Sequence, residues 1–286
     1  MFKKLNIGRV VILGSMSFIG KSIIAKFHDN NIRPVLISRK QVNFEKNDCF
    51  LKLKKILKKN DIIIFVVAVA PVKNVVMLNK NLIIARNIIA CLKTIKLKHL
   101  IYISSDAVYS DSNKKITENS ETVPTSLHGF MHLIRETMLK DLDCLKTFVR
   151  PTLVYGHHDP HDGYGPNKFI RCAQLNKKII LFGKGEEKRD HINVDNVASI
   201  VFEVVINKID GIVNAVSGSV ISFYEIAKNI KKIYPKTKIQ FKKRSGPMPH
   251  NGYRAFDNSL LKKKFSNVCI VNLKQWLKNK DKYKII

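Results

Sequence analysis

The sequence predicts an α/β protein, with a Rossmann-type doubly wound parallel sheet and a smaller C-terminal α/β lobe. Three observations support this fold class. Continuous apolar runs alternate with amphipathic helical patterns over about the first 156 residues. A turn that contains Gly14 and Gly20 directly follows the first apolar run. After Gly156 the alternation loosens into a loop rich in Gly, Pro, His and Asp. Continuous apolar strands that alternate with helices are typical of a parallel sheet covered on both faces.

The elements of the first half follow one another in strict alternation. Continuous apolar runs predict strands at residues 9–14, 33–38, 61–70, 99–105 and 146–156. Helical periodicity predicts helices at residues 17–30, 49–59, 79–95 and 126–142. One face of the first helix collects four apolar side chains, Ile19, Ile23, Ile24 and Phe27. Each strand is thus followed by a helix that can cover the sheet.

The second half divides differently. A loop at residues 157–167 precedes a helix, a short strand at 178–183 and the segment 189–205, and a smaller mixed segment runs from about Gly218 to the C-terminus. A chain of 286 residues is long enough for one large domain and a smaller lobe. We assign residues 1–156 and about 190–216 to the Rossmann domain, and about 157–189 and 217–286 to the lobe.

The chain is strongly basic, with 51 Lys and Arg, 22 Asp and Glu and a formal net charge of +29. One interpretation is a nucleic acid or an anionic membrane as partner. The other is a lysine-rich surface that follows from overall composition, because the lysines are spread along the whole chain and no basic block carries interleaved aromatic residues. We favour the second and expect neither nucleic acid nor membrane as partner. The positive field would still attract a phosphorylated ligand.

Cysteines and apolar runs bear on the compartment. The cysteines are scattered and have no Cys-x-x-Cys spacing: Cys49, Cys91, Cys144, Cys172 and Cys269. This pattern argues against a disulfide framework and favours a reducing compartment. The run at 61–72 is shorter than the ~18–20 residues of a membrane span. The N-terminal apolar run is short and enters a glycine turn at once, so we expect no signal peptide and a cytoplasmic protein.

The first strand-to-helix turn reads "GSMSFIG", from Gly14 to Gly20. Glycines here permit a close approach of the backbone to a pyrophosphate at the N-terminus of the next helix; an ordinary turn is the alternative. The turn resembles the TGxxGFIG fingerprint of the extended short-chain dehydrogenase/reductases, the nucleotide-sugar epimerase/dehydratase family, with a serine in place of the middle glycine. The resemblance implies a nicotinamide dinucleotide bound by Gly14, Ser15, Ser17, Phe18, Ile19, Gly20 and, near the end of the third strand, Ala68.

The end of the second strand bears on the choice of cofactor. "VLISRK" places Ser38 and Arg39 where an NAD-preferring site usually has an acidic residue for the ribose 2′-hydroxyl. No acid is present, and an arginine beside the ribose would pair with a 2′-phosphate. We therefore expect NADP, with NAD as the alternative if Arg39 is only a solvated residue at a strand end.

"SSDAVYS", residues 104–110, resembles the family's SSxxVYG segment. The resemblance implies that Ser105 hydrogen-bonds the reacting sugar hydroxyl and that Asp106 lies on the substrate side. In the family's 4,6-dehydratases the serine is followed by Asp-Glu, whereas Ala107 stands here in place of the glutamate. Its absence argues against a dehydratase. The form Ser-Ser-Asp-x-Val-Tyr also resembles the deoxysugar reductase branch, so reduction stays open.

"HGFMHLIRE", residues 128–136, lies where the family has Tyr-Gly-x-x-Lys. By this resemblance His128 stands at the position of the acid/base tyrosine. His132 stands at that of the lysine, which binds the cofactor ribose and lowers the tyrosine pKa. Spacing of four on a helix places both rings on one face. Gly129 and Glu136 match the family.

Three interpretations of the histidine pair stay open. In the first, which we favour, His128 is the general acid/base, because an imidazole pKa of about 6.5 suits proton transfer near neutrality; His132 then bonds the ribose or orients His128. In the second, the pair binds a metal, but the intervening residues offer no third ligand. In the third, the redox chemistry is lost. Tyr109 and Tyr155 are weaker candidates for a displaced acid. For the histidine-rich loop 157–161 we expect a substrate cover and no metal.

Motifs of the second half resemble the family's substrate side. "GYGPNKF" nominates Asn167 as a contact of the nucleotide diphosphate. "FGKGEEKRDHINVDNVA" resembles the GxGxxxRDxxxVxDxA segment, in which Arg189 corresponds to a diphosphate clamp. Guanidinium geometry suits bidentate phosphate binding; an ion pair of Arg189 with Glu186 or Asp190 is the alternative. Arg254 is a weaker phosphate candidate.

The resemblance extends from Val10 to about Leu261. It implies an NADP- or NAD-dependent epimerase or reductase of nucleoside-diphosphate sugars, in which hydride passes between a sugar carbon and the nicotinamide while Ser105 and His128 handle the hydroxyl proton. It also implies a homodimer. The alternative is a catalytically silent NADP-binding protein of the same fold that acts as a sensor or scaffold. The sugar and the base stay open.

Overall fold

The chain divides into two compact units. The structure is a computed structural model that describes residues 7–278. Unit 1 comprises Met1–Ser110, Ser120–Pro151 and Val197–Ala215, and unit 2 comprises Asp111–Asn119, Thr152–Asn196 and Val216–Ile286. The chain therefore leaves unit 1 and returns to it.

Unit 1 is built on a parallel sheet. Its strands are β1 (Val10–Leu13), β2 (Val35–Ile37), β3 (Ile62–Phe65), β4 (His99–Ile103), β5 (Leu145–Pro151) and β9 (Gly211–Ala215). Its helices are α1 (Phe18–Asp29), α2 (Cys49–Ile56), α3 (Val75–Leu92), the short 3-10 helix η1 (Asp106–Val108), α4 (Leu127–Lys140) and most of α6 (Val194–Ile206). The strand order is β2-β1-β3-β4-β5-β9, and every neighbouring pair is parallel. The order reverses at β1, so the carboxyl ends of β1 and β3 flank the point where such sheets bind ligands.

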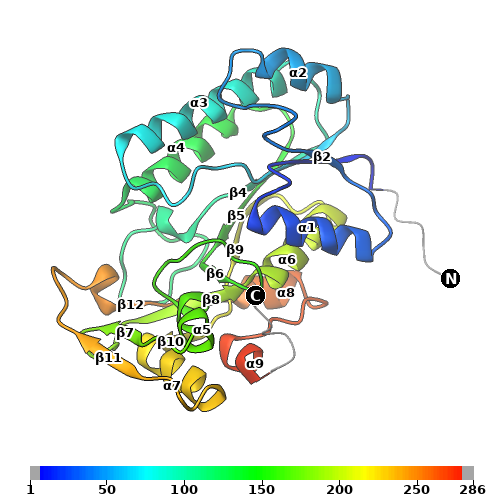
Figure 1. The fold of residues 1–286 in the computed structure, drawn as a ribbon. Coiled ribbons are helices and arrows are strands. Elements are labelled where there is room, and N and C mark those ends of the chain that lie inside the picture. The colour runs from blue at the N-terminus through cyan, green and yellow to red at the C-terminus, as the bar shows by residue number, and fades with distance from the viewer. Residues whose placement is uncertain (1–6, 279–286) are drawn as a thin grey trace. The chain divides into compact units, whose positions relative to one another are not determined.

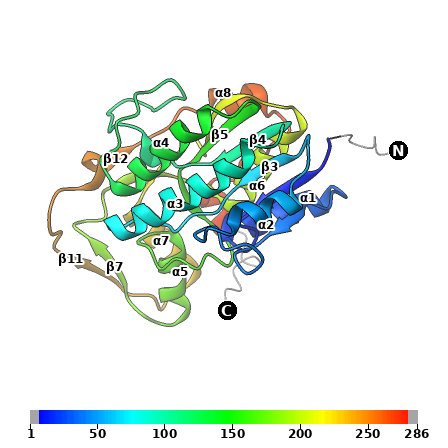
Figure 2. The same cartoon turned by 90° about the horizontal axis from the view of Figure 1, so that it is seen from above.

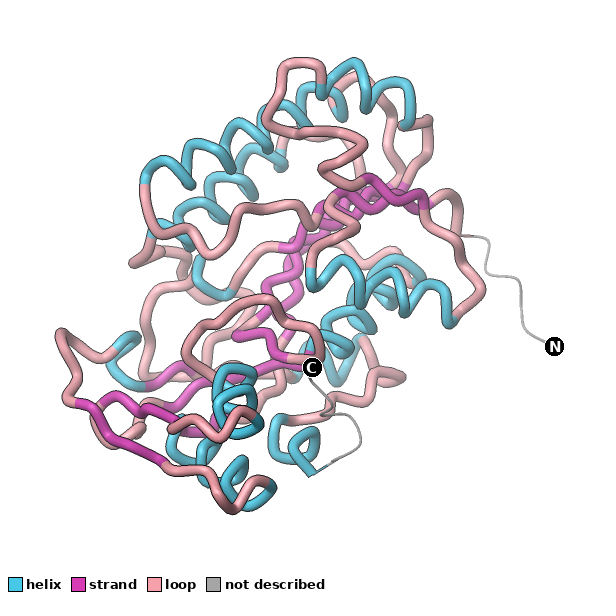
Figure 3. The backbone as a smooth tube through the Cα atoms, in the orientation of Figure 1, coloured by secondary structure: helices cyan, strands magenta, loops and turns pink. Residues whose placement is uncertain are grey.

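Helices cover both faces of this sheet. Figure 1 and Figure 3 show α2, α3 and α4 on one face and α1 and α6 on the other. Seen from above, α3 and α4 lie side by side (Figure 2). On the opposite face, Phe27 of α1 meets Phe202 of α6 with ring centres 5.2 Å apart. All residues of β1 and β3 are buried, which confirms the doubly wound parallel sheet that their continuous apolar runs predict.

α3 is long and apolar enough, by length and composition, to cross a membrane. Its side chains Ile84, Ala85 and Ile88 are buried in the core of unit 1, and α3 packs against α2 and α4. A helix that is buried against two other helices needs apolar side chains, so this packing accounts for the apolar composition of α3. The helix begins at Val75, four residues before the predicted start, because Asn74 accepts the Met77 N–H and caps it.

Unit 2 holds shorter strands. These are β6 (Leu153–Tyr155), β7 (Ile179–Phe182), β8 (Lys188–Asn193), β10 (Val220–Ser222), β11 (Ile239–Lys242) and β12 (Tyr253–Arg254). The helices are α5 (Pro166–Gln174), α7 (Phe223–Ile233), the 3-10 helix η2 (Pro249–Gly252), α8 (Ser259–Lys264) and α9 (Leu273–Lys278). β8 pairs with β6, β10 and β12, and β7 pairs with β11. Phe169, Phe223 and Trp276 belong to the apolar core that joins α5, α7 and α9.

The structure differs from the predicted strands and domain boundaries in several places. The third strand ends at Phe65 and not at residue 70. The strand predicted at 146–156 divides at Thr152, because β5 pairs with β4 and β9 whereas β6 pairs with β8. Residues 152–156 and 190–196, which we assigned to the Rossmann domain, therefore group with unit 2. Residues 111–119 also belong to unit 2, where Ile116 bridges Phe256.

Candidate active site

The turn between β1 and α1 leaves no room for side chains at its two glycines. Gly14 has a φ of +94°, and a Cβ there would lie 2.7 Å from the Val67 backbone nitrogen. A Cβ on Gly20 would lie 2.6 Å from the Gly14 carbonyl oxygen. Real Cβ atoms do not approach backbone atoms so closely, so glycine is required at both positions. The turn at Gly14 thus packs directly against the segment that follows β3, and the start of α1 packs against the turn.

Ser17, the residue in place of the middle glycine, caps α1. Its Oγ accepts the Gly20 N–H at 3.0 Å and donates to the Gly14 carbonyl at 2.8 Å. Its hydroxyl is therefore committed to the turn. Phe18 and Ile19 begin the helix, whose first backbone N–H groups have no partner within it, and no acidic side chain lies in its first turn. This positive helix end behind two tight glycines fits the pyrophosphate of a dinucleotide.

The remaining predicted cofactor residues surround this turn at the strand ends. Ser15 is buried, and Ala68 is half-buried in the segment after β3. Ser38 uses its backbone N–H to bond Gln41 at 2.9 Å. Arg39 is 63% exposed and pairs with Glu45 at 2.6 Å. The guanidinium would have to share or leave this carboxylate to reach a 2′-phosphate.

The turn after β4 carries Ser105 and Asp106. Ser105 caps η1, accepting the Ala107 N–H at 3.2 Å. A Cβ on Gly129 of α4 would lie 2.0 Å from the Ala107 carbonyl oxygen. This glycine therefore allows α4 to touch η1. The contact brings the helix that carries the histidine pair against the turn that carries Ser105.

The two histidines of α4 are in contact. The His128 and His132 ring centres lie 4.7 Å apart with the rings perpendicular. His132 is buried, and its Nδ1 lies 2.7 Å from the Tyr102 hydroxyl. His128 is half-buried, and its Nδ1 faces the Val72 N–H at 3.5 Å.

Burial keeps both imidazoles neutral near pH 7. It lowers the pKa of His128, while the charge of Asp106 acts in the opposite direction. Burial also lowers the pKa of His132 well below its ordinary value, and the neighbouring His128 and Arg135 lower it further. The ordinary imidazole pKa assumed from the sequence is therefore corrected downwards by the fold. A neutral His128 can accept a proton.

A buried network lies beside the pair, and of its members the sequence indicated only Glu136 and Tyr109. Ser104 donates to Glu136, which also accepts two hydrogen bonds from Arg150. The Arg150 guanidinium lies 4.7 Å from the ring centre of Tyr109, whose hydroxyl donates to Asn214 at 2.7 Å. The match of Glu136 to the family was the available signal. Since Tyr109 is buried with its hydroxyl engaged, it does not present a displaced acid.

Tyr155 of unit 2 is likewise buried with its hydroxyl engaged. It is 1% exposed, and its hydroxyl donates to the Val271 carbonyl at 3.3 Å. Neither tyrosine thus offers an exposed hydroxyl.

Arg189, the predicted diphosphate clamp, is nearly buried on β8. It pairs with Glu187 at 3.0 Å, and Arg244 lies 3.7 Å from the same carboxylate. The alternative partners named from the sequence, Glu186 and Asp190, were wrong. Residues two apart on a strand share a face, so Glu187 lies on the same side as Arg189, whereas Asp190 points to the opposite side. The arginine thus has a carboxylate partner and a second cation beside it.

A second buried arginine lies close to Arg189. Arg254 is 1% exposed and lies 3.1 Å from Asp111 and 3.2 Å from His250. Burial lowers the pKa of His250, and the charges of Arg189 and Arg254 lower it further. Arg189 and Arg254 thus come together with His250, and we call these three with Arg244 the basic group of unit 2. Sequence reasoning missed Arg244, Asp111 and His250, which match no motif.

Asn167 is buried at the start of α5. Its Nδ2 donates to the Gly156 carbonyl at 2.7 Å and to Asp159 at 3.1 Å, whereas its Oδ1 has no hydrogen-bond partner. The amide therefore anchors the loop 157–161 and keeps one acceptor available. Among residues 7–278, no group of three or more His, Cys, Asp or Glu side chains could hold a metal.

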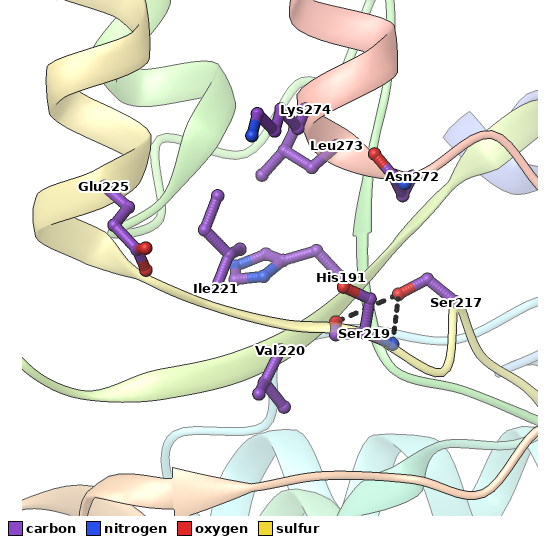
Figure 4. A pocket seen from close by; sticks show the side chains of 9 residues that line it. All are labelled: His191, Ser217, Ser219, Val220, Ile221, Glu225, Asn272, Leu273 and Lys274. Atoms are coloured by element: carbon purple, nitrogen blue, oxygen red, sulfur yellow. Dashed lines mark hydrogen bonds between the residues drawn. The ribbon is translucent and has the colours of Figure 1, made fainter.

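A cavity of about 160 Å³ opens in unit 2 beside β10, α7 and α9 (Figure 4). Its lining includes His191, Ser217, Ser219, Glu225 and Lys274. None of the predicted site residues lines it. Ligand pockets typically measure ~300–1,000 Å³, so this cavity is too small for a nucleotide sugar.

Comparisons with known proteins show the family of the chain. The model of the NAD dependent epimerase/dehydratase family matches residues 10–215. A curated dTDP-D-glucose 4,6-dehydratase from Dictyostelium discoideum is 26% identical over 265 residues, which cover 81% of this chain and 57% of that protein. The chain therefore spans little more than half of that relative's length.

Two solved structures share the fold. The UDP-glucose 4-epimerase of Thermus thermophilus in complex with NAD superposes with a TM-score of 0.80 at 17% identity, over 94% of this chain and 96% of that one. A GDP-L-fucose synthetase from Naegleria fowleri bound to NADP gives 0.78 at 14% identity, over 97% and 92%. The parallel sheet, the two glycines of the turn and the family match lead to one conclusion: the chain belongs to the NAD dependent epimerase/dehydratase family.

Proposed function

We propose that the protein is an NAD(P)-dependent epimerase or reductase of nucleoside-diphosphate sugars. The observation that carries the proposal is the neutral His128 on a helix that touches the Ser105 turn through Gly129. Family membership and the fit of the glycine turn to a pyrophosphate support it. The substrate class is supported by two structural relatives, a UDP-glucose 4-epimerase and a GDP-L-fucose synthetase.

In this reaction a bound nicotinamide supplies the hydride acceptor or donor, and the chain handles the proton. His128, which burial keeps unprotonated, accepts the proton of the sugar hydroxyl and later returns it. Ser105 hydrogen-bonds the same hydroxyl. Asp106 stabilises the imidazolium that forms, because its charge favours protonation of His128.

The reaction class follows from Ala107. A 4,6-dehydratase of the family has a glutamate there, whereas the alanine side chain cannot accept or donate a proton. Although one curated relative is named a 4,6-dehydratase, we propose epimerisation or reduction for this chain.

On the substrate side, we propose that the basic group of unit 2 binds the diphosphate. Arg189 and Arg254 are held in place by Glu187 and Asp111, and preorganised guanidinium groups suit phosphate oxygens. For the cofactor we propose NADP, on the strength of Arg39 and the absence of an acid beside it. We also propose a homodimer, from the resemblance, and a cytoplasmic location, from the cysteine pattern.

A catalytically silent NADP-binding protein is the second candidate, and one observation favours it. His132, at the lysine position, is 4% exposed. A side chain so enclosed has little access to a cofactor ribose.

One experiment tests both candidates. The purified protein is mixed with NADP⁺ or NAD⁺ and a panel of UDP-, GDP-, dTDP- and CDP-sugars, with absorbance at the reduced nicotinamide band and product chromatography as readouts. His128→Gln should lower kcat by about 10²- to 10⁴-fold with cofactor binding retained. His28→Gln, in the last turn of α1, is the matched control and should leave kcat unchanged. Cofactor binding without turnover of any sugar would instead establish the silent binder.

A further inference from the structure

We infer that Arg135 supplies the fixed positive charge of the catalytic helix, in place of the lysine whose position His132 occupies, and that it acts on His128 through Tyr102 and His132. The inference rests on the proposed function for its catalytic meaning. Arg135 touches no reacting atom in this account, so it is a positioning residue.

Arg135 is a fully buried cation that contacts two aromatic rings. It is 0% exposed. Its guanidinium carbon lies 4.6 Å from the ring centre of Phe65 and 5.5 Å from that of Tyr102, and one nitrogen donates to the Val67 carbonyl at 3.0 Å. In the part of the chain that the structure describes, its Nε has no hydrogen-bond partner and no carboxylate pairs with it. An apolar side chain of similar volume would make the folded protein at least as stable as this unpaired cation does, so stability alone does not explain the arginine.

A line of contacts joins this cation to His128. The guanidinium faces Tyr102 and its charge acts on the Tyr102 hydroxyl. That hydroxyl lies 2.7 Å from His132 Nδ1, and the His132 ring meets the His128 ring. A guanidinium only donates hydrogen bonds, so it favours the arrangement in which the phenol proton points to His132. His132 then carries its proton on Nε2, and its ring is fixed beside His128.

The other charges near the pair do not replace Arg135. Glu136 on α4 is committed to Arg150 of β5. Asp106 of η1 acts on His128 and favours its protonation. From α3, the side chain that bonds the segment after β3 is the uncharged Asn81. Arg135 is therefore the cation that opposes an imidazolium at His132, so that the proton accepted in the reaction stays on His128.

The same arginine connects the helix to the cofactor turn. Val67, whose carbonyl accepts from Arg135, donates its own N–H to Leu13 at 3.1 Å. Val67 is also the residue against which Gly14 is packed. The histidine helix is thus tied to the glycine turn across residues that are far apart in the sequence.

The first test needs no activity. Histidine-ring NMR titrations of the full chain between pH 4 and 9 compare wild type, Arg135→Met and Arg135→Lys, with His128→Gln and His132→Gln for assignment. Arg135→Met should raise the pKa of His132, because the positive charge that lowers it is gone, whereas Arg135→Lys should not. The thermal stability of Arg135→Met should equal or exceed that of wild type. Identical titrations of both histidines in the Met variant and wild type would overturn the inference.

The second test moves the positive charge from position 135 to position 132. Arg135→Met should lower kcat roughly tenfold or more with KM unchanged, and the acidic limb of the pH profile should move to higher pH. The double variant His132→Lys/Arg135→Met places a cation one turn earlier and should recover most of the lost kcat. A double variant as inactive as Arg135→Met would contradict the inference. If Arg135→Met does not fold, Arg135→Lys still decides it: because it keeps the positive charge it should keep kcat near the wild-type value, and a large loss of kcat in this variant overturns the inference. If wild type itself turns over no sugar, the proposed function fails while the NMR result still stands.

Discussion

Arg135 of unit 1 and the buried arginines of unit 2 are held in opposite ways. Arg135 lies against the rings of Phe65 and Tyr102 and pairs with no carboxylate of the described residues, although Arg150 of the same unit pairs with Glu136. In unit 2, Arg189 and Arg254 each face a carboxylate, Glu187 and Asp111. Aromatic rings and a backbone carbonyl therefore hold Arg135, whereas carboxylates hold Arg189 and Arg254.

The difference suits two kinds of chemistry. A dry, uncompensated surrounding keeps imidazoles neutral, so that a proton can be accepted and returned. Paired guanidinium groups stay charged and ordered, which suits an anion such as a diphosphate. The following changes test the contrast, from the largest expected effect to the smallest.

Gly129→Ala should cause the largest loss, because it separates α4 from η1. The new Cβ would lie 2.0 Å from the Ala107 carbonyl oxygen. Such overpacking against backbone should cost about 3 kcal/mol or more of unfolding free energy, measured by urea denaturation. Gly163→Ala in unit 2 is the control, since no atom lies within 4 Å of its Cβ, and it should stay within about 0.5 kcal/mol. Equal losses for the two variants would argue against the α4–η1 contact.

Acid should weaken unit 1 through its buried histidines. Burial lowers the pKa of His99 to about 4, against about 6.5 in the unfolded chain. Between these values the unfolded state binds more protons, so stability is fully present above pH 6.5 and is lost as pH falls towards 4. The loss should be on the order of 2–3 kcal/mol. His128 and His132 act in the same direction.

The comparison variant for this effect is His99→Asn. Its amide can still face Thr147, whose Oγ1 lies 2.8 Å from His99 Nε2, but it does not titrate. Unfolding free energies at pH 7, 5.5 and 4.5 should fall less steeply in the variant. The same slope in both proteins would rule out His99 as a source of acid sensitivity.

Arg189→Met should weaken substrate binding more than turnover. A charge-assisted hydrogen bond contributes about 1.5–3 kcal/mol, so KM for the nucleotide sugar should rise about 10- to 100-fold. Glu187→Gln keeps a hydrogen-bond acceptor that can hold Arg189 in place but removes the negative charge shared by Arg189 and Arg244, so it should leave KM equal or lower. Steady-state kinetics and calorimetry with the free nucleoside diphosphate measure both. A Glu187→Gln variant that binds as poorly as Arg189→Met would mean that the pair is only structural.

Arg39→Ala should have the smallest effect, because this arginine is exposed and already paired with Glu45. Loss of about 1 kcal/mol predicts a several-fold weaker binding of NADP and unchanged binding of NAD, by fluorescence titration. Glu45→Gln should change NADP affinity in the opposite direction. A parallel loss for both cofactors would remove the case for a 2′-phosphate contact.

Much of the fold and part of the site were predictable from local sequence. The alternation of apolar runs with helical periodicity predicted the parallel sheet, which is observed. Spacing of four placed His128 and His132 on one helix face, and their rings touch. Glycines at 14 and 20 predicted the tight turn. These features depend on residues a few positions apart, whose backbone geometry fixes where their side chains point.

Only the tertiary structure decided the charge environment. Arg135 looks like any surface residue of an amphipathic helix, yet its guanidinium bonds a carbonyl 68 positions away in the sequence. His250 meets Asp111 across 139 positions, and the strand at 146–156 divides because its halves find partners in different sheets. The amino-acid sequence by itself determined the fold class, the glycine turn and the spacing of the histidine pair. Which of the site residues are buried, paired or neutral was decided by long-range contacts, because desolvation and ion pairing depend on what surrounds a group in space and not on its neighbours along the chain.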